Sequence, residues 1–268
     1  MQAVRDLLTP RPLPEPDESE AVGQRRRRVV AVTLVAGTLA LGATLAAPRG
    51  SLAFTLLGFL VAGIWLTGAV ATGPLDPAGL TAGESAGGPA TGAGATSRLD
   101  AGPTGAADSE GEADRVVGDR TDAGGWGRRV GEAVAAVGLG GLTFVGFLGA
   151  SVVASWVPAL DGAVDSVLAK AEAGTTAVVL AVAVLNAVAE EVFFRGALPL
   201  ALSGPRRAAV AVAVYVLVTV ATLNVALVLA AVVMGTVLMA ERLATRGVMA
   251  PVLTHVTWSI LMLLAFPG

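Results

Sequence analysis

The sequence predicts an all-α fold, a polytopic transmembrane helical bundle of about seven transmembrane helices with a disordered linker. Charged residues make up only 15% of the chain and hydrophobic residues 54%, whereas a soluble globular protein carries about 25% charged residues. The charges also gather in a few short segments, which leaves long stretches without any. These stretches reach the length of about 20 apolar residues with which a helix crosses the hydrocarbon core of a bilayer.

The apolar stretches define the spans in chain order. Stretches 29–47 and 52–71 are separated by a short turn and predict a two-helix transmembrane hairpin. Single spans are expected further along, at 133–157, 175–203 and 248–266.

The stretch 208–240 is too long for one crossing. It is uncharged for 33 residues, and a helix of that length would reach about 50 Å at 1.5 Å per residue. We predict that it splits at 222–224 into two short helices, and a re-entrant pair is the alternative.

Basic residues predict the orientation of the spans. With Arg25–Arg28 in the cytoplasm, only Arg49 and Lys170 of the 18 lysines and arginines fall in external loops, as the positive-inside rule requires. The N-terminus is therefore expected on the cytoplasmic side, with 156–174 as the main external loop. The bias toward Ala, Val and Gly and the lack of an organelle signal favour the plasma membrane of a prokaryote, where membrane lipid surrounds the protein.

Composition divides the chain into four parts. Residues 1–28 are polar and proline-rich, which predicts a disordered cytoplasmic tail ahead of the hairpin of 29–72. Residues 73–127 are rich in Gly, Ala and acidic residues and have few large apolar side chains, so burial cannot offset the entropy of ordering them. They predict a disordered linker, and 128–268 then form a five-helix unit.

The residue inventory limits the possible chemistry. The chain has no cysteine, which excludes disulfides, thiolate metal sites and cysteine nucleophiles. Its one histidine is His255. The main basic run is Arg25–Arg28, so the sequence gives no support for nucleic acid as a partner.

The first candidate cluster is formed by Glu190, Glu191 and Arg195. Ionisable residues within a span cost about 2.5–3.5 kcal/mol each and are functional candidates by default. Glu191 and Arg195 are four residues apart on a helix and can pair on one face. Glu190 is rotated by about 100° from Glu191, which leaves it as a free carboxylate suited to general-base chemistry. The alternative is that all three lie at the membrane interface, where charges are ordinary.

A second polar cluster lies in the last span. His255 and Ser259 share one helical face there, and Tyr215 and Thr219 form a similar pair on an earlier helix. At about 1.5 Å per residue these pairs and Glu190 lie at compatible depths in the cytoplasmic half of the bilayer. Three helices are therefore expected to bring polar groups to one level. Hydrogen bonds between helices are the alternative role for such residues.

These motifs resemble those of the CPBP (CAAX protease and bacteriocin-processing, or Abi) family of intramembrane proteases. Residues 190–196 read as its EExxxR motif with flanking aromatics and glycine. Residues 215–219 occupy the place of its FxxxH motif, and 255–259 that of its HxxxN motif. The resemblance covers about 128–267 and implies a (metallo)endopeptidase that acts on a peptide or membrane-protein substrate and opens toward the cytoplasmic leaflet.

The resemblance also implies a role for each matching residue. Glu190 would activate the hydrolytic water, and Glu191, held by Arg195, would orient the site. His255 would stabilise the oxyanion, or would bind a divalent metal such as zinc together with Glu190. Ser259 would assist where the family has asparagine.

Two departures from the family keep other hypotheses open. Thr219 stands where the family has histidine, and a threonine can position a water but cannot replace an imidazole base. The zinc ligands available are His255 and carboxylates, short of the usual three protein ligands, so a metal-independent mechanism stays equally open. A catalytically impaired CPBP-fold scaffold that binds a peptide and a transporter with Glu190 and His255 as a proton pair are the competing hypotheses, although the sequence shows none of the inverted repeats typical of transporters.

Overall fold

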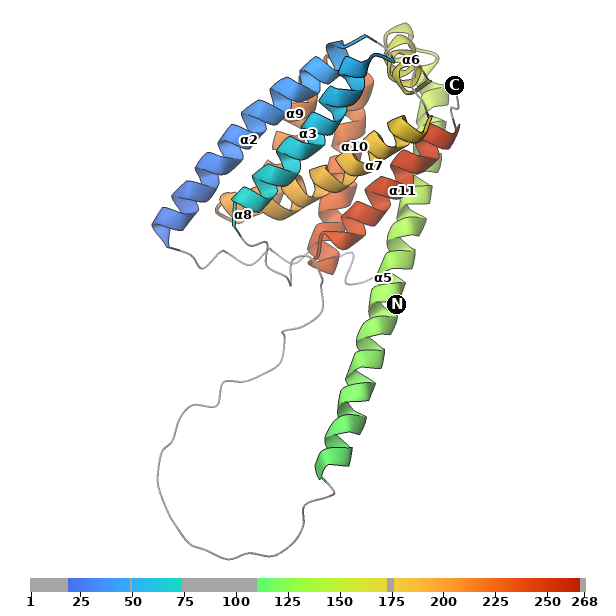
Figure 1. The fold of residues 1–268 in the computed structure, drawn as a ribbon. Coiled ribbons are helices and arrows are strands. Elements are labelled where there is room, and N and C mark those ends of the chain that lie inside the picture. The colour runs from blue at the N-terminus through green and yellow to red at the C-terminus, as the bar shows by residue number, and fades with distance from the viewer. Residues whose placement is uncertain (1–18, 49, 74–109, 173–175, 266–268) are drawn as a thin grey trace, which may run out of the picture. The chain divides into compact units, whose positions relative to one another are not determined.

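The computed structural model of the protein describes residues 19–48, 50–73, 110–172 and 176–265. Every regular element within these ranges is a helix, which confirms the predicted all-α fold (Figure 1). The elements are α2 (Glu20–Ala46), α3 (Leu52–Ala71), α5 (Glu110–Ala154), α6 (Pro158–Glu172), α7 (Thr176–Glu191), the π-helix η1 (Val192–Ala197), α8 (Leu198–Ala201), α9 (Arg207–Val220), α10 (Val225–Thr245) and α11 (Met249–Ala265).

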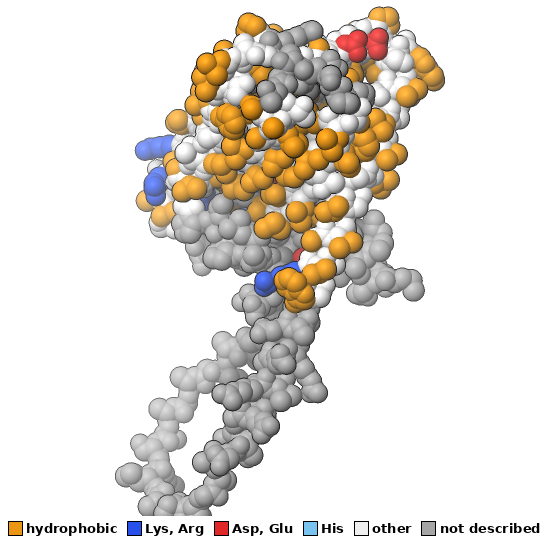
Figure 2. Space-filling model, turned by 45° about the vertical axis from the view of Figure 1, so that its right-hand side comes forward, with side chains coloured by type: hydrophobic (Ala, Val, Ile, Leu, Met, Phe, Trp, Pro, Cys, Tyr) orange, Lys and Arg blue, Asp and Glu red, His pale blue; other side chains and the backbone are white. Residues whose placement is uncertain are grey.

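Seven apolar segments match the predicted number of spans. Five are long and apolar enough to cross a membrane, namely α2, α3, the 126–154 part of α5, the continuous stretch from α7 to α8, and α10. The helices α9 and α11 are shorter but also apolar. Large hydrophobic side chains are exposed on many of these helices, and Figure 2 shows them over much of one face. The chain is a multi-pass membrane protein, and such a surface suits lipid as its solvent.

The first helix begins earlier than predicted. α2 starts at Glu20 and includes the arginine run that was assigned to the tail, while residues 1–18 lie outside the described ranges. Arginine is a good helix former, and the run also has a partner to bind. The Arg26 side chain is 8% exposed and donates to the carbonyls of Thr72 at 3.2 Å and Leu200 at 3.5 Å. The basic run thus fastens α2 to the ends of α3 and α8.

Two further segments differ from the predicted loops. α5 begins at Glu110, inside the range assigned to the linker, of which 74–109 lie outside the described residues. The predicted external loop 156–174 contains α6, which starts at Pro158 as helices often do. The Asn224 side chain holds α6 by donating to Ala163 O at 2.8 Å and Ser166 Oγ at 2.9 Å.

The long uncharged stretch splits into two helices at the predicted place. α9 ends at Val220 and α10 begins at Val225. Leu223 adopts a left-handed conformation with φ 52°, which ends the helical path. Asn224 then caps α10, because its side-chain oxygen accepts from Leu227 N at 3.0 Å.

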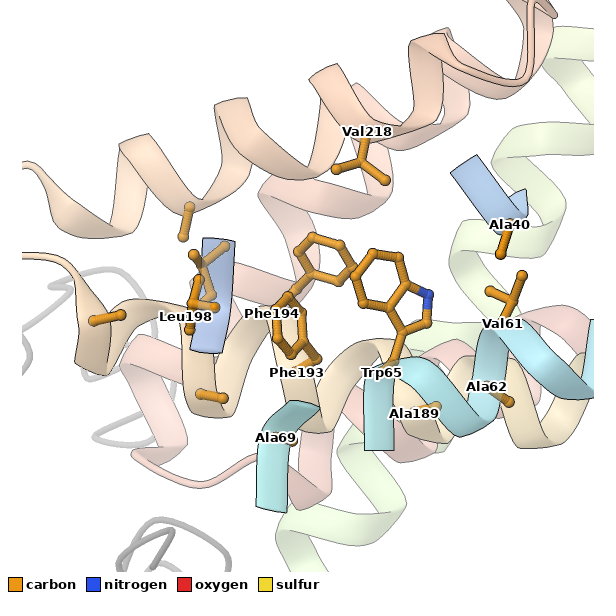
Figure 3. Close-up of a cluster of buried hydrophobic side chains, with 14 of the residues drawn as sticks. Ala40, Val61, Ala62, Trp65, Ala69, Ala189, Phe193, Phe194, Leu198 and Val218 are labelled. Atoms are coloured by element: carbon orange, nitrogen blue, oxygen red, sulfur yellow. The ribbon is translucent and has the colours of Figure 1, made fainter. Parts of the chain in front are cut away.

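An aromatic cluster forms the centre of the core. Trp65 of α3 lies 5.0 Å from Phe193 and 4.9 Å from Phe194 between ring centroids, and all three side chains are at most 1% exposed (Figure 3). Gly37 of α2 allows this packing, since a Cβ atom at that position would collide with the Trp65 ring. Glycine serves such close helix contacts in membrane proteins.

The hairpin and the C-terminal helices therefore share one core. The chain divides into two compact units, one made of 1–82 with 133–268 and the other of 83–132. The predicted division of the chain placed the hairpin of 29–72 and the C-terminal helices in separate parts. The structure instead packs α3 against α7 and η1, the helices that carry the glutamate motif.

Candidate active site

The glutamate motif lies where an α-helix changes into a π-helix. α7 ends at Glu191, and η1 carries Val192–Ala197. π-helical turns are rare and are found frequently at functional sites. Glu191 Oε1 accepts from Arg195 NH1 at 3.0 Å, and the two side chains are 0% and 1% exposed. The predicted pair therefore forms, and both side chains are buried within the protein.

Arg195 is held by its backbone as well as its side chain. Pro199 lies four residues further on and has no N–H to donate to the carbonyl of Arg195. Arg242 of α10 supplies the missing donor, with Nε 3.1 Å from that carbonyl oxygen. The Arg195 guanidinium also lies over the Tyr215 ring, 4.5 Å from its centroid, a favourable cation–π contact.

His255 completes a chain of buried contacts. Its Nδ1 lies 2.9 Å from Glu191 Oε1, the same oxygen that accepts from Arg195. Since a paired carboxylate can only accept, we assign the proton of this contact to Nδ1. Nε2 is then the imidazole nitrogen left for a substrate. Glu191 thus orients His255, as the family resemblance implies for a residue that organises the site.

Glu190 has a different environment from its neighbour. Its side chain is half-buried, and its Oε2 accepts from the Tyr215 hydroxyl at 3.0 Å. No ion pair to Glu190 is present among the described residues. The two adjacent carboxylates therefore differ as their rotation on the helix predicts: Glu191 is paired, and Glu190 is available.

Glu190 opens into a cavity of about 180 Å³, which it shares with Tyr215, Thr219, His255 and Trp258. A water molecule takes up roughly 30 Å³ in the liquid, so this volume holds several waters. The opposite wall comes from the N-terminal hairpin and consists of apolar side chains, namely Leu41, Leu45 and Trp65. The cavity therefore offers a carboxylate, an imidazole, several hydroxyl groups and room for water beside an apolar wall.

The two residues that depart from the family contribute less. Thr219 lines the cavity, but its hydroxyl donates to Tyr215 O at 3.0 Å, within its own helix. Ser259 does not line the cavity. Of the predicted site residues, the structure brings Glu190, His255 and Thr219 together at the cavity, places Glu191 and Arg195 behind them, and leaves Ser259 aside.

Sequence reasoning missed three features of the site. It noted Tyr215 only as half of a polar pair and did not find its bond to Glu190, which joins residues 25 positions apart. It assigned no role to the hairpin residues in the cavity wall. It also overlooked buried Glu241, whose Oε1 lies 2.8 Å from Thr254 Oγ1 and ties α10 to α11. A carboxylate just past a long apolar stretch was the available signal, but it resembled an ordinary helix end.

A second cavity, of about 710 Å³, lies between α5, α6 and α10. Its lining is apolar apart from two hydroxyl groups. Those of Thr143 and Ser151 donate to carbonyls of their own helix, each at 2.8 Å. This cavity therefore has room for apolar groups but offers no acid, base or nucleophile.

The residues present do not fit a tightly held catalytic zinc. Such a site needs about three protein ligands, and the candidates at the cavity are Glu190 and His255. One oxygen of Glu190 binds Tyr215, and one nitrogen of His255 binds Glu191. Over the part of the chain that the structure describes, no three His, Cys, Asp or Glu side chains group so that they could hold a metal ion.

Comparison with protein families identifies the segment that carries this site. The model of the Type II CAAX prenyl endopeptidase Rce1-like family matches residues 172–261. The match includes Glu190, Glu191, Arg195, Tyr215 and His255. Residues 172–261 are thus similar to this family, which is consistent with the CPBP resemblance of the motifs. Neither the comparison with curated proteins nor that with solved structures gave a significant match.

The segment that matches the family model supplies the polar groups of the site but not the whole cavity. Helices α2 and α3 lie outside the matched residues, yet Leu41, Leu45 and Trp65 from these helices close the cavity. The catalytic candidates therefore depend on a hairpin that the family match does not cover.

Proposed function

We propose that the protein is an intramembrane endopeptidase that hydrolyses peptide bonds of membrane-associated proteins with water activated by Glu190. The observation that carries the proposal is the half-buried, ion-pair-free Glu190 carboxylate in a cavity that it shares with His255. The match of residues 172–261 to the family model supports the same class of reaction.

The mechanism begins at Glu190. Its carboxylate accepts a proton from a water in the cavity while the water oxygen attacks the carbonyl carbon of the scissile peptide bond. The carbonyl oxygen becomes an oxyanion. When the C–N bond breaks, the proton on Glu190 passes to the leaving amine nitrogen, and Glu190 is again a carboxylate. A positioned acid–base group of this kind contributes about 10²–10⁴-fold to a rate.

His255 supplies the second interaction in this scheme. With Nδ1–H directed to Glu191, an imidazolium form of His255 would donate Nε2–H to the oxyanion, which is the usual way to stabilise acyl-transfer intermediates. The Glu191 carboxylate balances the positive charge of that form. Arg195 fixes the other side of Glu191, so the imidazole is oriented before the substrate binds.

Metal removal tests whether this mechanism needs an ion. The donor set at the cavity is short of the three ligands of a catalytic zinc site, so cleavage is expected to continue at an unchanged rate after exhaustive dialysis against EDTA and 1,10-phenanthroline. The measurement is the rate of product formation before and after dialysis, with metal content determined by mass spectrometry. A rate that falls with chelation and returns with Zn²⁺ would show that the protein binds a catalytic metal.

A second candidate function is peptide binding without catalysis. Two observations favour it. The Thr219 hydroxyl donates to a backbone carbonyl of its own helix, and Ser259 does not line the cavity. Such a scaffold would keep the cavity and the buried Arg195–Glu191–His255 chain but would not cleave its ligand.

A cleavage assay separates the two functions. Purified protein in detergent is incubated with a library of peptides from membrane proteins, wild type beside Glu190→Gln, and the products are identified by mass spectrometry. A peptidase gives products that vanish in Glu190→Gln, and their ends give the substrate class. If folded protein forms no Glu190-dependent product, the peptidase function is refuted and peptide binding without catalysis is favoured.

A further inference from the structure

We propose that Tyr215 is the positioning residue for Glu190, and that its hydroxyl holds the carboxylate in the orientation from which it activates water. The inference rests on the proposed peptidase function and adds a residue that the family motif does not provide. In the resemblance described above, the place of Tyr215 belongs to phenylalanine, which has no hydroxyl to donate.

The contact between the two residues is direct. The Tyr215 hydroxyl donates to Glu190 Oε2 at 3.0 Å, and both side chains line the cavity. The distance lies within the range of about 2.5–3.0 Å for O–H···O hydrogen bonds. Oε1 has no hydrogen bond to a described side chain and is the oxygen that we assign to accept the proton of a water.

The tyrosine ring is itself held firmly in place. Phe194 meets it edge-on at 4.9 Å between ring centroids, and the Arg195 guanidinium covers one face at 4.5 Å. Gly235 of α10 packs against the ring edge, where a Cβ atom would lie 3.2 Å from Tyr215 Cδ1. A hydroxyl on a ring held by contacts from η1 and α10 gives Glu190 one orientation rather than several.

Thr219 cannot provide this hydrogen bond in the present arrangement. It lies one helical turn beyond Tyr215 and lines the same cavity, but its hydroxyl donates to the backbone carbonyl of Tyr215. The family pattern has an aromatic residue followed one turn later by histidine. This chain has tyrosine followed by threonine, and the hydroxyl that binds Glu190 comes from the tyrosine.

Three variants test the role on the cleavage reaction of the wild-type protein. Tyr215→Phe keeps the ring and its packing but removes the donor, and we expect kcat to fall about 10²-fold, the size of effect that misplacement of a catalytic group causes. KM should change little, because the ring and the cavity wall are retained. Leu217→Ala is the control on the same helix, because Leu217 is exposed and does not line the cavity, and it should leave both parameters close to wild type.

The double variant Tyr215→Phe/Thr219→His tests whether a donor one turn away can substitute. It restores the aromatic-plus-histidine pattern of the family and should recover most of the lost kcat. A kcat of Tyr215→Phe equal to that of the wild type would overturn the proposal. So would a loss confined to KM, since that would show a role in the cavity wall alone.

Infrared spectroscopy provides a readout that does not depend on cleavage. The difference spectrum between wild type and Glu190→Gln isolates the bands of the Glu190 carboxyl group. The same difference recorded in the Tyr215→Phe background should show these bands shifted by the loss of the hydrogen bond. Identical bands in both backgrounds would contradict the contact.

The two levels of the hypothesis fail in different ways. Wild-type protein that forms no Glu190-dependent product would refute the peptidase function, whatever the spectra show. Wild-type cleavage that Tyr215→Phe leaves unchanged would refute only the positioning role. Unfolding temperatures of all variants in the same detergent show that differences in kcat do not arise from loss of fold.

Discussion

At the residue scale, two adjacent carboxylates have opposite roles because the helix turns them in different directions. The spacing of Glu191 and Arg195 was enough to predict their pairing, since residues four apart on a helix share a face. The contact of His255 with Glu191 spans 64 residues. The sequence placed these side chains at one depth but could not show that they touch, because the contact depends on how α11 packs against α7. The hydrogen bond from Tyr215 to Glu190 could not be predicted for the same reason, because it also depends on how helices pack.

Replacing Glu191 should therefore destabilise the protein. Glu191→Gln removes the negative charge that faces buried Arg195 and His255, and an unpaired buried charge costs about 3–5 kcal/mol. The measurement is the unfolding temperature in detergent, and we expect a marked fall. Glu190→Gln, at the neighbouring half-buried position without an ion pair, is the matched control and should unfold close to wild type. Equal unfolding temperatures for the two variants would contradict the assigned roles.

At the element scale, apolar length predicted the helices better than it predicted their ends. The split between α9 and α10 was visible in the sequence because an uncharged stretch of 33 residues exceeds one crossing. The early start of α2 was not visible in the sequence, because a run of arginines resembles a polar tail. Only the structure shows that Arg26 binds the carbonyls of Thr72 and Leu200. The π-helix was also hidden.

Packing between α2 and α3 gives a prediction at this scale. Gly37→Ala places a methyl group against the Trp65 ring, and overpacking of this kind costs about 1–3 kcal/mol. Gly63→Ala on α3 is the control, because a Cβ atom there meets nothing within 4 Å, and alanine is a better helix former than glycine by about 1 kcal/mol. We expect a lower unfolding temperature for Gly37→Ala only. If both variants unfold alike, α2 and α3 are not packed as described.

At the scale of the whole molecule, the all-α membrane architecture followed from composition. The resemblance to the CPBP family, with which the match over 172–261 is consistent, followed from three motifs. The partition of the chain was harder to predict. The hairpin of 29–72 and the C-terminal helices are separated in sequence by a long low-complexity stretch, so nothing local indicates that Trp65 packs against Phe193. Composition shows which segments are apolar, but not which apolar faces meet.

The shared core predicts that the C-terminal helices need the hairpin. A chain of residues 110–268 produced alone lacks Leu41, Leu45 and Trp65 of the cavity wall and leaves Phe193 without its aromatic partner. We expect it to be unstable and without Glu190-dependent cleavage. Co-production with a separate chain of residues 1–73 should restore both fold and activity, as judged by co-purification and cleavage. Full activity of 110–268 alone would show that the hairpin is dispensable.

The most direct measurement is the single-turnover cleavage rate of wild type and Glu190→Gln on a peptide that the library assay has identified. Both proteins are reconstituted in vesicles, and their unfolding temperatures are compared. If Glu190 activates the water, Glu190→Gln will cleave about 10²–10⁴-fold more slowly while it unfolds at the temperature of the wild type. Cleavage at the wild-type rate by folded Glu190→Gln would contradict the central claim that this carboxylate is the catalytic base.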